Sequence, residues 1–149
     1  MLWIKLYVAG FLPLCVLLAL AASRWGGHTE KQVAWAFVIA ALAQKSSLYW
    51  SRLNFKYLEP GVLIVDFGLF IVLMVLAIRD PKTWLLIATA FQLLSASAHL
   101  ARMIDVGMSP LAYAILMGSG GYPILILLAA GILAKARQQR KMPARVTTG

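Results

Sequence analysis

A line of polar residues in an otherwise apolar segment is the feature of this sequence best suited to chemistry. It consists of Gln92, Ser95, His99 and Arg102. Their spacings of three, four and three residues put the side chains on one face of a helix. An imidazole can hold or pass a proton near neutral pH. Because ionisable groups in an apolar helix are costly, we expect this face to meet protein, water or a ligand.

A carboxylate is expected at the same depth. Asp66 is the only charged residue of the apolar segment 60–78, and a turn at 80–81 connects that segment to the next. Residues equally far from the turn lie level in two regular antiparallel helices. Asp66 is then level with Ser95, and His99 lies about one helical turn further from the turn. We therefore predict an intramembrane polar cluster of Asp66, Gln92, Ser95 and His99.

Each part of this arrangement also has a purely structural interpretation. Gln92 and Ser95 can serve as hydrogen bonds between neighbouring helices, each worth about 0.6 kcal/mol on average. Asp66 and His99 can form a structural pair or a functional one, and the sequence leaves both open. The same depth counting places Arg102 level with Glu59, which predicts an ion pair at the outer rim.

A helix interruption is predicted further along the chain. Three glycines and a proline fall within six positions, as Gly118, Gly120, Gly121 and Pro123. This composition disfavours a regular helix and permits a kink or a break. A broken helix would turn backbone groups toward Asp66 and His99, as several transporters do at their binding sites. Small residues also let another helix approach closely, and that alternative remains open.

The composition predicts an all-α, multi-pass membrane protein. The chain has 149 residues, 62% of them hydrophobic and 13% charged, with a mean hydropathy of +0.82. A soluble domain has roughly 45–50% apolar and about 25% charged residues. We predict one domain over 1–134, a bundle of about five spans at 2–23, 31–50, 60–78, 81–104 and 110–134. The second span is the least certain, because its uninterrupted apolar run covers only 33–43.

The positive charge is concentrated at the C-terminus. The net charge is +9, and a basic juxtamembrane tail at 135–149 holds Lys135, Arg137, Arg140, Lys141 and Arg145. A basic segment directly after a span is typical of a topology determinant that meets anionic lipid, or of a tail that docks a partner, and not of a nucleic-acid binder. Nine of the fourteen Lys and Arg residues fall on the side of the C-terminus, which predicts an outside N-terminus and a cytoplasmic C-terminus.

Several chemistries are disfavoured because the sequence lacks residues that they need. Cys15 is the only cysteine, so no cysteine-based metal site is expected. No motif places a nucleophile beside a base and an orienting group, so no enzyme activity is predicted. His99 could serve as an axial ligand to haem or a pigment, but a second membrane-embedded histidine is lacking. We predict no cofactor and no metal.

Part of the sequence resembles a type of short hydrophobic protein from alphaproteobacteria, described only as hypothetical membrane proteins. The resemblance covers about the last ninety residues, from Gly61 through Arg79-Asp80 to Trp84, and then Gln92-Leu93-Leu94, His99-Leu100-Ala101-Arg102 and Asp105. Asp66, His99, Arg102, Asp105 and Tyr113 occupy the polar positions of that type. The resemblance implies a location in the bacterial inner membrane and implies no activity.

Two functions are compatible with these features. A small chain with few helices, no soluble domain and small-residue faces is typical of an accessory or self-associating subunit of a membrane assembly, with itself, other membrane subunits and lipid as partners. The alternative is a small oligomeric proton-coupled transporter or channel, in which Asp66 and His99 form the titrating pair. We expect the first, and we keep the second as the rival hypothesis.

Overall fold

The structure, a computed structural model, describes the backbone of residues 2–50, 60–105, 107, 109, 116 and 120–141, and the side chains of 10–46 and 61–141 within those ranges. The described part is all helical and contains no strand, so the predicted all-α class is confirmed. Its five helices are α1 (Leu2–Trp25), α2 (His28–Trp50), α3 (Pro60–Arg79), α4 (Thr83–Ile104) and α6 (Tyr122–Lys141).

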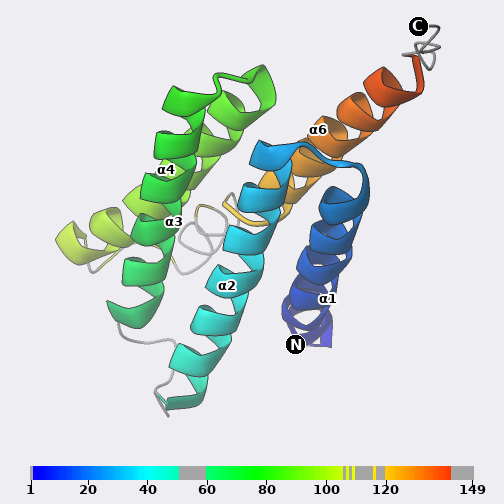
Figure 1. The fold of residues 1–149 in the computed structure, drawn as a ribbon. Helices are drawn as coiled ribbons and strands as arrows, with labels where there is room; N and C mark the ends of the chain where they lie inside the picture. Colours follow the sequence, from blue (N-terminus) through cyan, green and yellow to red (C-terminus); the bar gives the residue numbers. More distant parts are fainter. Residues whose placement is uncertain are drawn as a thin grey trace, which may run out of the picture.

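The helices form a closed ring (Figure 1). Helix α1 contacts α2, α2 contacts α3, α3 contacts α4, α4 contacts α6, and α6 returns to α1. The sequence neighbours α1–α2 and α3–α4 are joined by short turns, as expected for antiparallel helix pairs. Helix α2 also contacts α6 across the ring, so residues facing inward from several helices can meet.

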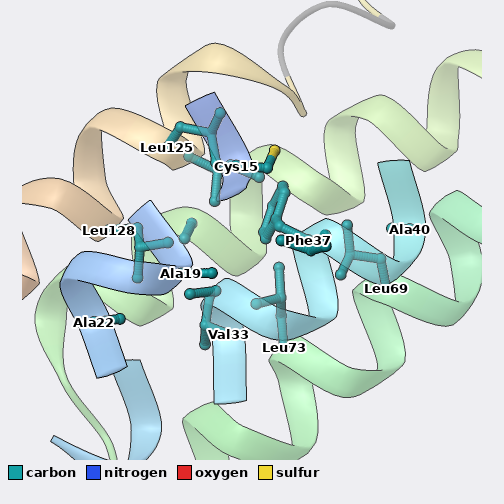
Figure 2. Packing of buried hydrophobic residues seen from close by; sticks show 14 of the residues in the cluster. Cys15, Ala19, Ala22, Val33, Phe37, Ala40, Leu69, Leu73, Leu125 and Leu128 are labelled. Atoms are coloured by element: carbon teal, nitrogen blue, oxygen red, sulfur yellow. The ribbon is translucent and has the colours of Figure 1, made fainter. Parts of the chain in front are cut away.

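An apolar core fills one part of this ring (Figure 2). Small residues on α1 recur at Cys15, Ala19 and Ala22, a spacing that lines one helix face. They leave room for larger side chains from the neighbouring helices, because small residues allow close helix approach. The other labelled core residues in Figure 2 are Val33, Phe37, Ala40, Leu69, Leu73, Leu125 and Leu128.

The outward faces of the helices are also apolar. Helices α3 and α4 are both long and apolar enough to cross a membrane, and α1 contains a shorter apolar stretch, Gly10–Trp25. Large apolar side chains point away from the core on several helices, including Leu17, Ile64 and Ile126, each more than 60% exposed. A helix that is apolar on all sides is suited to a deep core or to lipid.

Helix α6 differs from the predicted fifth span. That span was placed at 110–134, whereas α6 begins at Tyr122 and continues to Lys141. The helix therefore extends seven residues beyond the predicted end and carries Lys135, Arg137, Arg140 and Lys141 on its last turns. Lys, Arg, Gln and Ala are good helix formers, and cations are favourable at a helix C-terminus. Arg145 lies outside the described residues.

Candidate functional site

Asp66 lies at the centre of a buried polar cluster. The residue sits on α3 with only 5% of its surface exposed. Leu69 and Leu73 follow it at helical spacing and are also buried, so Asp66 continues the inward face of α3. A carboxylate at such a position needs hydrogen-bond partners, because a buried ionised group without them is very costly.

Helix α4 supplies three hydrogen-bond partners of Asp66, two of them to the carboxylate. His99 Nε2 lies 3.0 Å from Asp66 Oδ2, and the Ser95 hydroxyl donates to the same oxygen over 3.3 Å. Gln92 Nε2 donates to the Asp66 backbone carbonyl at 3.2 Å. These α4 residues are each 1% exposed. The structure thus brings together the four residues of the predicted cluster. The sequence placed His99 about one helical turn beyond the level of Asp66, and the His99 side chain reaches across that turn to the carboxylate.

Helix α2 supplies a partner that sequence reasoning missed. Gln44 Nε2 donates to Asp66 Oδ1 at 2.8 Å. In the sequence Gln44 stands out only as the residue that ends the apolar run 33–43. However, it follows buried Val33, Phe37 and Ala40 at helical spacing, and this periodicity would have placed it on the inward face.

The start of α6 lies against the cluster. Gly120 and Gly121 form a turn where the glycines predicted an interruption, and Pro123 is the second residue of the helix, where its missing N–H is not needed. A Cβ atom on Gly120 would lie 2.5 Å from Ser95 Cβ and 3.1 Å from Gln92 Oε1. Gly118 lies outside the described residues. The positive end of the α6 dipole therefore lies beside a residue that binds the Asp66 carboxylate.

A second close contact fixes α6 against α4 further along the helix. A Cβ atom on Gly131 would lie 2.8 Å from the indole ring of Trp84. Gly120 lies in the turn before α6 and Gly131 within the helix, and each lies close to a side chain of α4. Two glycines therefore allow α6 to approach α4 at both the cluster and the opposite part of the interface.

Asp66 and His99 bring two ionisable side chains into one buried contact. With an ionised carboxylate, a neutral His99 whose proton is on Nε2 donates it to Oδ2. The other direct ligands of the carboxylate, Gln44 and Ser95, carry no charge. The cluster therefore combines one pair of ionisable side chains with neutral hydrogen-bond donors.

Two other predicted roles concern Arg102, as part of a rim ion pair, and His99, as a ligand to haem or a pigment. Arg102 is half-buried at the end of α4, but Glu59 lies outside the described residues, so the rim ion pair stays a prediction. His99 Nε2, one of the two ring nitrogens that could bind a haem or pigment, faces Asp66. Among the described residues, no group of three or more His, Cys, Asp or Glu side chains could hold a metal ion.

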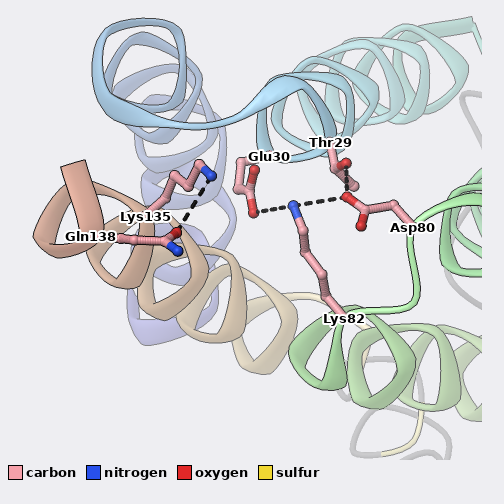
Figure 3. Close-up of polar contacts among 6 residues, drawn as sticks. All are labelled: Thr29, Glu30, Asp80, Lys82, Lys135 and Gln138. Carbon is pink, nitrogen blue, oxygen red and sulfur yellow. Dashed lines mark hydrogen bonds and ion pairs between the residues drawn. The ribbon is translucent and has the colours of Figure 1, made fainter. Parts of the chain in front are cut away.

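A second polar cluster joins two helix turns at one end of the bundle (Figure 3). Lys82 Nζ, just before α4, lies 2.8 Å from Glu30 Oε1 on α2 and 2.9 Å from Asp80 Oδ2 in the α3–α4 turn. The Thr29 hydroxyl donates to Asp80 as well. Sequence analysis indicated only a turn at 80–81 here and no contact among these residues. The partners are more than fifty residues apart in the chain, and no local pattern reveals such pairing.

This end cluster predicts a pH dependence of stability. The hydrogen bond from Thr29 and then that from Lys82 lower the pKa of Asp80. Burial opposes the charge of Lys82, but hydrogen bonds to Glu30 and Asp80 outweigh it and raise the pKa of Lys82. Stability from Asp80 is present above its ordinary pKa and is lost as the pH falls through the lowered value. Stability from Lys82 is present below its ordinary pKa and is lost as the pH rises through the raised value.

We expect Lys82→Met to lower the thermal unfolding temperature in detergent most between about pH 5 and pH 9, where both groups are charged. The difference from the unsubstituted protein should shrink as the pH falls below the ordinary pKa of Asp80 and through its lowered value. Lys31→Met is the matched control, because Lys31 is an exposed lysine at the same end. A Lys82→Met deficit that is the same at pH 3 and pH 7 would contradict the assignment.

Comparison with known proteins does not extend this picture: no family model, curated protein or solved structure matches the chain. The resemblance to short alphaproteobacterial membrane proteins therefore stays a prediction.

Proposed function

We propose that this protein is a multi-pass protein of the bacterial inner membrane in which the Asp66–His99 pair binds and releases a proton during proton-coupled transport or channel activity. The observation that carries the proposal is the 3.0 Å contact between His99 Nε2 and Asp66 Oδ2, with both groups buried among apolar helices. Ionisable pairs in such surroundings mark proton relays in many pumps and transporters.

The membrane location is supported by the distribution of apolar and charged residues. The helices are apolar inside and outside the ring, and α3 and α4 meet the length requirement for spans. The turns that follow α1 and α3 lie at the same end as the C-terminus of α6 (Figure 1). That end carries Arg24, Lys31, Arg79, Lys82 and the basic residues of α6. An excess of Lys and Arg at one end favours a cytoplasmic location for that end, in contact with anionic lipid.

A proton-binding role explains the residue types better than a structural clamp. Neutral amide and hydroxyl groups could hold α2, α3 and α4 together without burying any charge. The cluster instead uses a carboxylate and an imidazole, and a buried ionisable pair is weak support for stability because its desolvation penalty is large. What the pair adds is the ability to change its net charge by one proton.

The test is a comparison of Asp66→Asn with the unsubstituted protein in liposomes. Asparagine has nearly the same shape and can still accept the bond from Gln44, but it cannot ionise. We expect proton flux under an imposed membrane potential to fall at least tenfold, and a titrating carboxyl infrared band of the unsubstituted protein to disappear. Asp105→Asn, at an exposed carboxylate that follows α4, is the matched control and should retain both signals.

Two results would count against the proposal. Equal proton flux in Asp66→Asn and the unsubstituted protein would remove the assigned role of the pair. A carboxyl band that never titrates between pH 4 and pH 9 would show that the pair does not exchange protons in the working range.

The accessory or self-associating subunit predicted from chain size is the second candidate. One observation favours it: an apolar groove lies on the outer side of the α3–α4 pair, lined by Phe70, Met74, Ala77, Ile78, Leu86, Thr89, Ala90 and Leu93. Thr89 donates its hydroxyl to the Leu85 carbonyl within α4, so the groove presents little unsatisfied polarity. Small residues at such a surface favour helix association in lipid. A single monodisperse monomer in mild detergent would count against this function.

A further inference from the structure

The two carboxylate oxygens of Asp66 are held by different helices. Oδ1 accepts its hydrogen bond from Gln44 of α2, whereas Oδ2 accepts from Ser95 and lies against His99, both of α4. The bond to α2 is thus a single contact on its own oxygen. Any change in the charge of the carboxylate is transmitted to α2 through Gln44.

The other end of α2 is anchored in a way that does not involve this site. Thr29 donates to Asp80, and Glu30 pairs with Lys82, so the first turn of α2 is tied to the α3–α4 turn (Figure 3). About 21 Å of helix separates Glu30 from Gln44 at 1.5 Å per residue. Between these links α2 meets α3 through apolar side chains such as Phe37 and Leu73. Such contacts are non-directional and permit small shifts.

Protonation affects only one of these two anchors. A hydrogen bond to an ionised carboxylate is roughly twice as strong as one to a neutral acceptor. Neutralising Asp66 therefore weakens the bond from Gln44, while the link at Thr29 and Glu30 is unchanged. Of the described groups around Asp66, α4 contributes one titratable side chain, His99, with Arg102 about a turn beyond it. Helix α2 contributes neutral Gln44 followed by exposed Lys45, and the turn before α6 contributes Gly120.

We infer that Gln44 is the positioning residue through which α2 responds to the proton at the Asp66–His99 pair. This inference rests on the proposed proton-binding function. Proton binding loosens the bond from Gln44 to Asp66 Oδ1, and the C-terminal half of α2 tilts away from α3 and α4 about its anchored first turn. Helix α2 is then the element that opens the buried pair, and Gln44 closes it again when the proton leaves.

The test measures distances between spin labels in the full-length protein in lipid nanodiscs. In a Cys15→Ala background, one label pair is placed at Ser46 of α2 and Leu100 of α4, both exposed positions beside the site. A control pair at Gln32 and Thr83, also exposed, reports on the anchored end. We expect the first distance to lengthen by several ångströms from pH 8 to pH 5, while the control distance stays the same.

Two variants identify the role of Gln44. Gln44→Met keeps the length of the side chain but removes the donor, and we expect it to give the low-pH distance at both pH values. Asp66→Asn, which is permanently neutral, should do the same. A pH-dependent shift that survives in Gln44→Met would overturn the inference.

The infrared signal of the carboxyl separates this inference from the function on which it rests. If the Asp66 band titrates but the distance from Ser46 to Leu100 is the same at both pH values, proton binding stands and the role of Gln44 falls. If the band does not titrate, both fall.

Discussion

Asp66→Leu is expected to lower the free energy of unfolding by about 3 kcal/mol, because removing one partner of a buried pair leaves the others unsatisfied. Gln44, Ser95 and His99 would lose the Asp66 carboxylate as a hydrogen-bond acceptor, and Ser95 and His99 are buried away from water. A leucine of similar volume does not create a cavity, so the loss reports on the polar contacts. The measurement is reversible unfolding in mixed micelles, followed by loss of helical circular dichroism.

Asp66→Asn is the matched variant for this experiment. It keeps the shape and most of the hydrogen-bonding capacity, and we expect it to cost less than about 1 kcal/mol, the net worth of a typical hydrogen bond. The large gap between the two variants is the expected signature of a hydrogen-bonded centre. Equal stability of Asp66→Leu and Asp66→Asn would mean that the cluster contributes no hydrogen-bond energy to the fold.

Gly120→Ala is expected to cost about 2 kcal/mol, within the range for overfilling a well-packed site. The added methyl group would lie 2.5 Å from Ser95 Cβ, and Ser95 sits in the middle of α4, so a rotamer change cannot relieve the contact. The start of α6 must move away or Ser95 must move from Asp66. We therefore expect both lower stability and a weaker carboxyl titration signal.

Two further substitutions provide a control and a compensating change for this prediction. Gly68→Ala is the control, because nothing lies within 4 Å of a Cβ atom there, and removing a glycine from a helix interior should be neutral or stabilising by up to about 1 kcal/mol. Ser95→Gly in the Gly120→Ala background removes the opposing atom and should restore part of the lost stability. If Gly120→Ala unfolds like the unsubstituted protein, the close approach of α6 to α4 is not a feature of the folded state.

Local patterns in the sequence predicted the helices and much of the cluster. Apolar runs indicated all five described helices, and counting from the α3–α4 turn placed Asp66 level with Ser95, because both helices are regular over that distance. The glycines at 120 and 121 predicted an interruption, because their weak helix propensity acts locally. These successes rest on information contained within one or two neighbouring segments.

The contacts that sequence reasoning missed all depend on how the ring closes. The sequence around Gln44 does not indicate its contact with Asp66, because that contact depends on α2 lying beside α3. Glu30 and Lys82 pair because two helix turns meet at the same end of the bundle. Helix α6 also continues past residue 134, where the predicted span ends, because the following Lys, Arg and Gln residues favour helix. Pairings across the ring are set by tertiary contacts, which periodicity along one segment does not encode.

The division of the Asp66 partners between helices has a consequence for biogenesis. Ser95 and His99 belong to the helix that directly follows α3 in the chain, joined to it by a short turn. When α3 and α4 enter a membrane together as a hairpin, the carboxylate arrives with its counter-group already beside it, before α6 has been synthesised. On the proposed membrane location, Asp66 would enter the bilayer already beside its α4 partners, and the α3–α4 hairpin would be the unit of insertion.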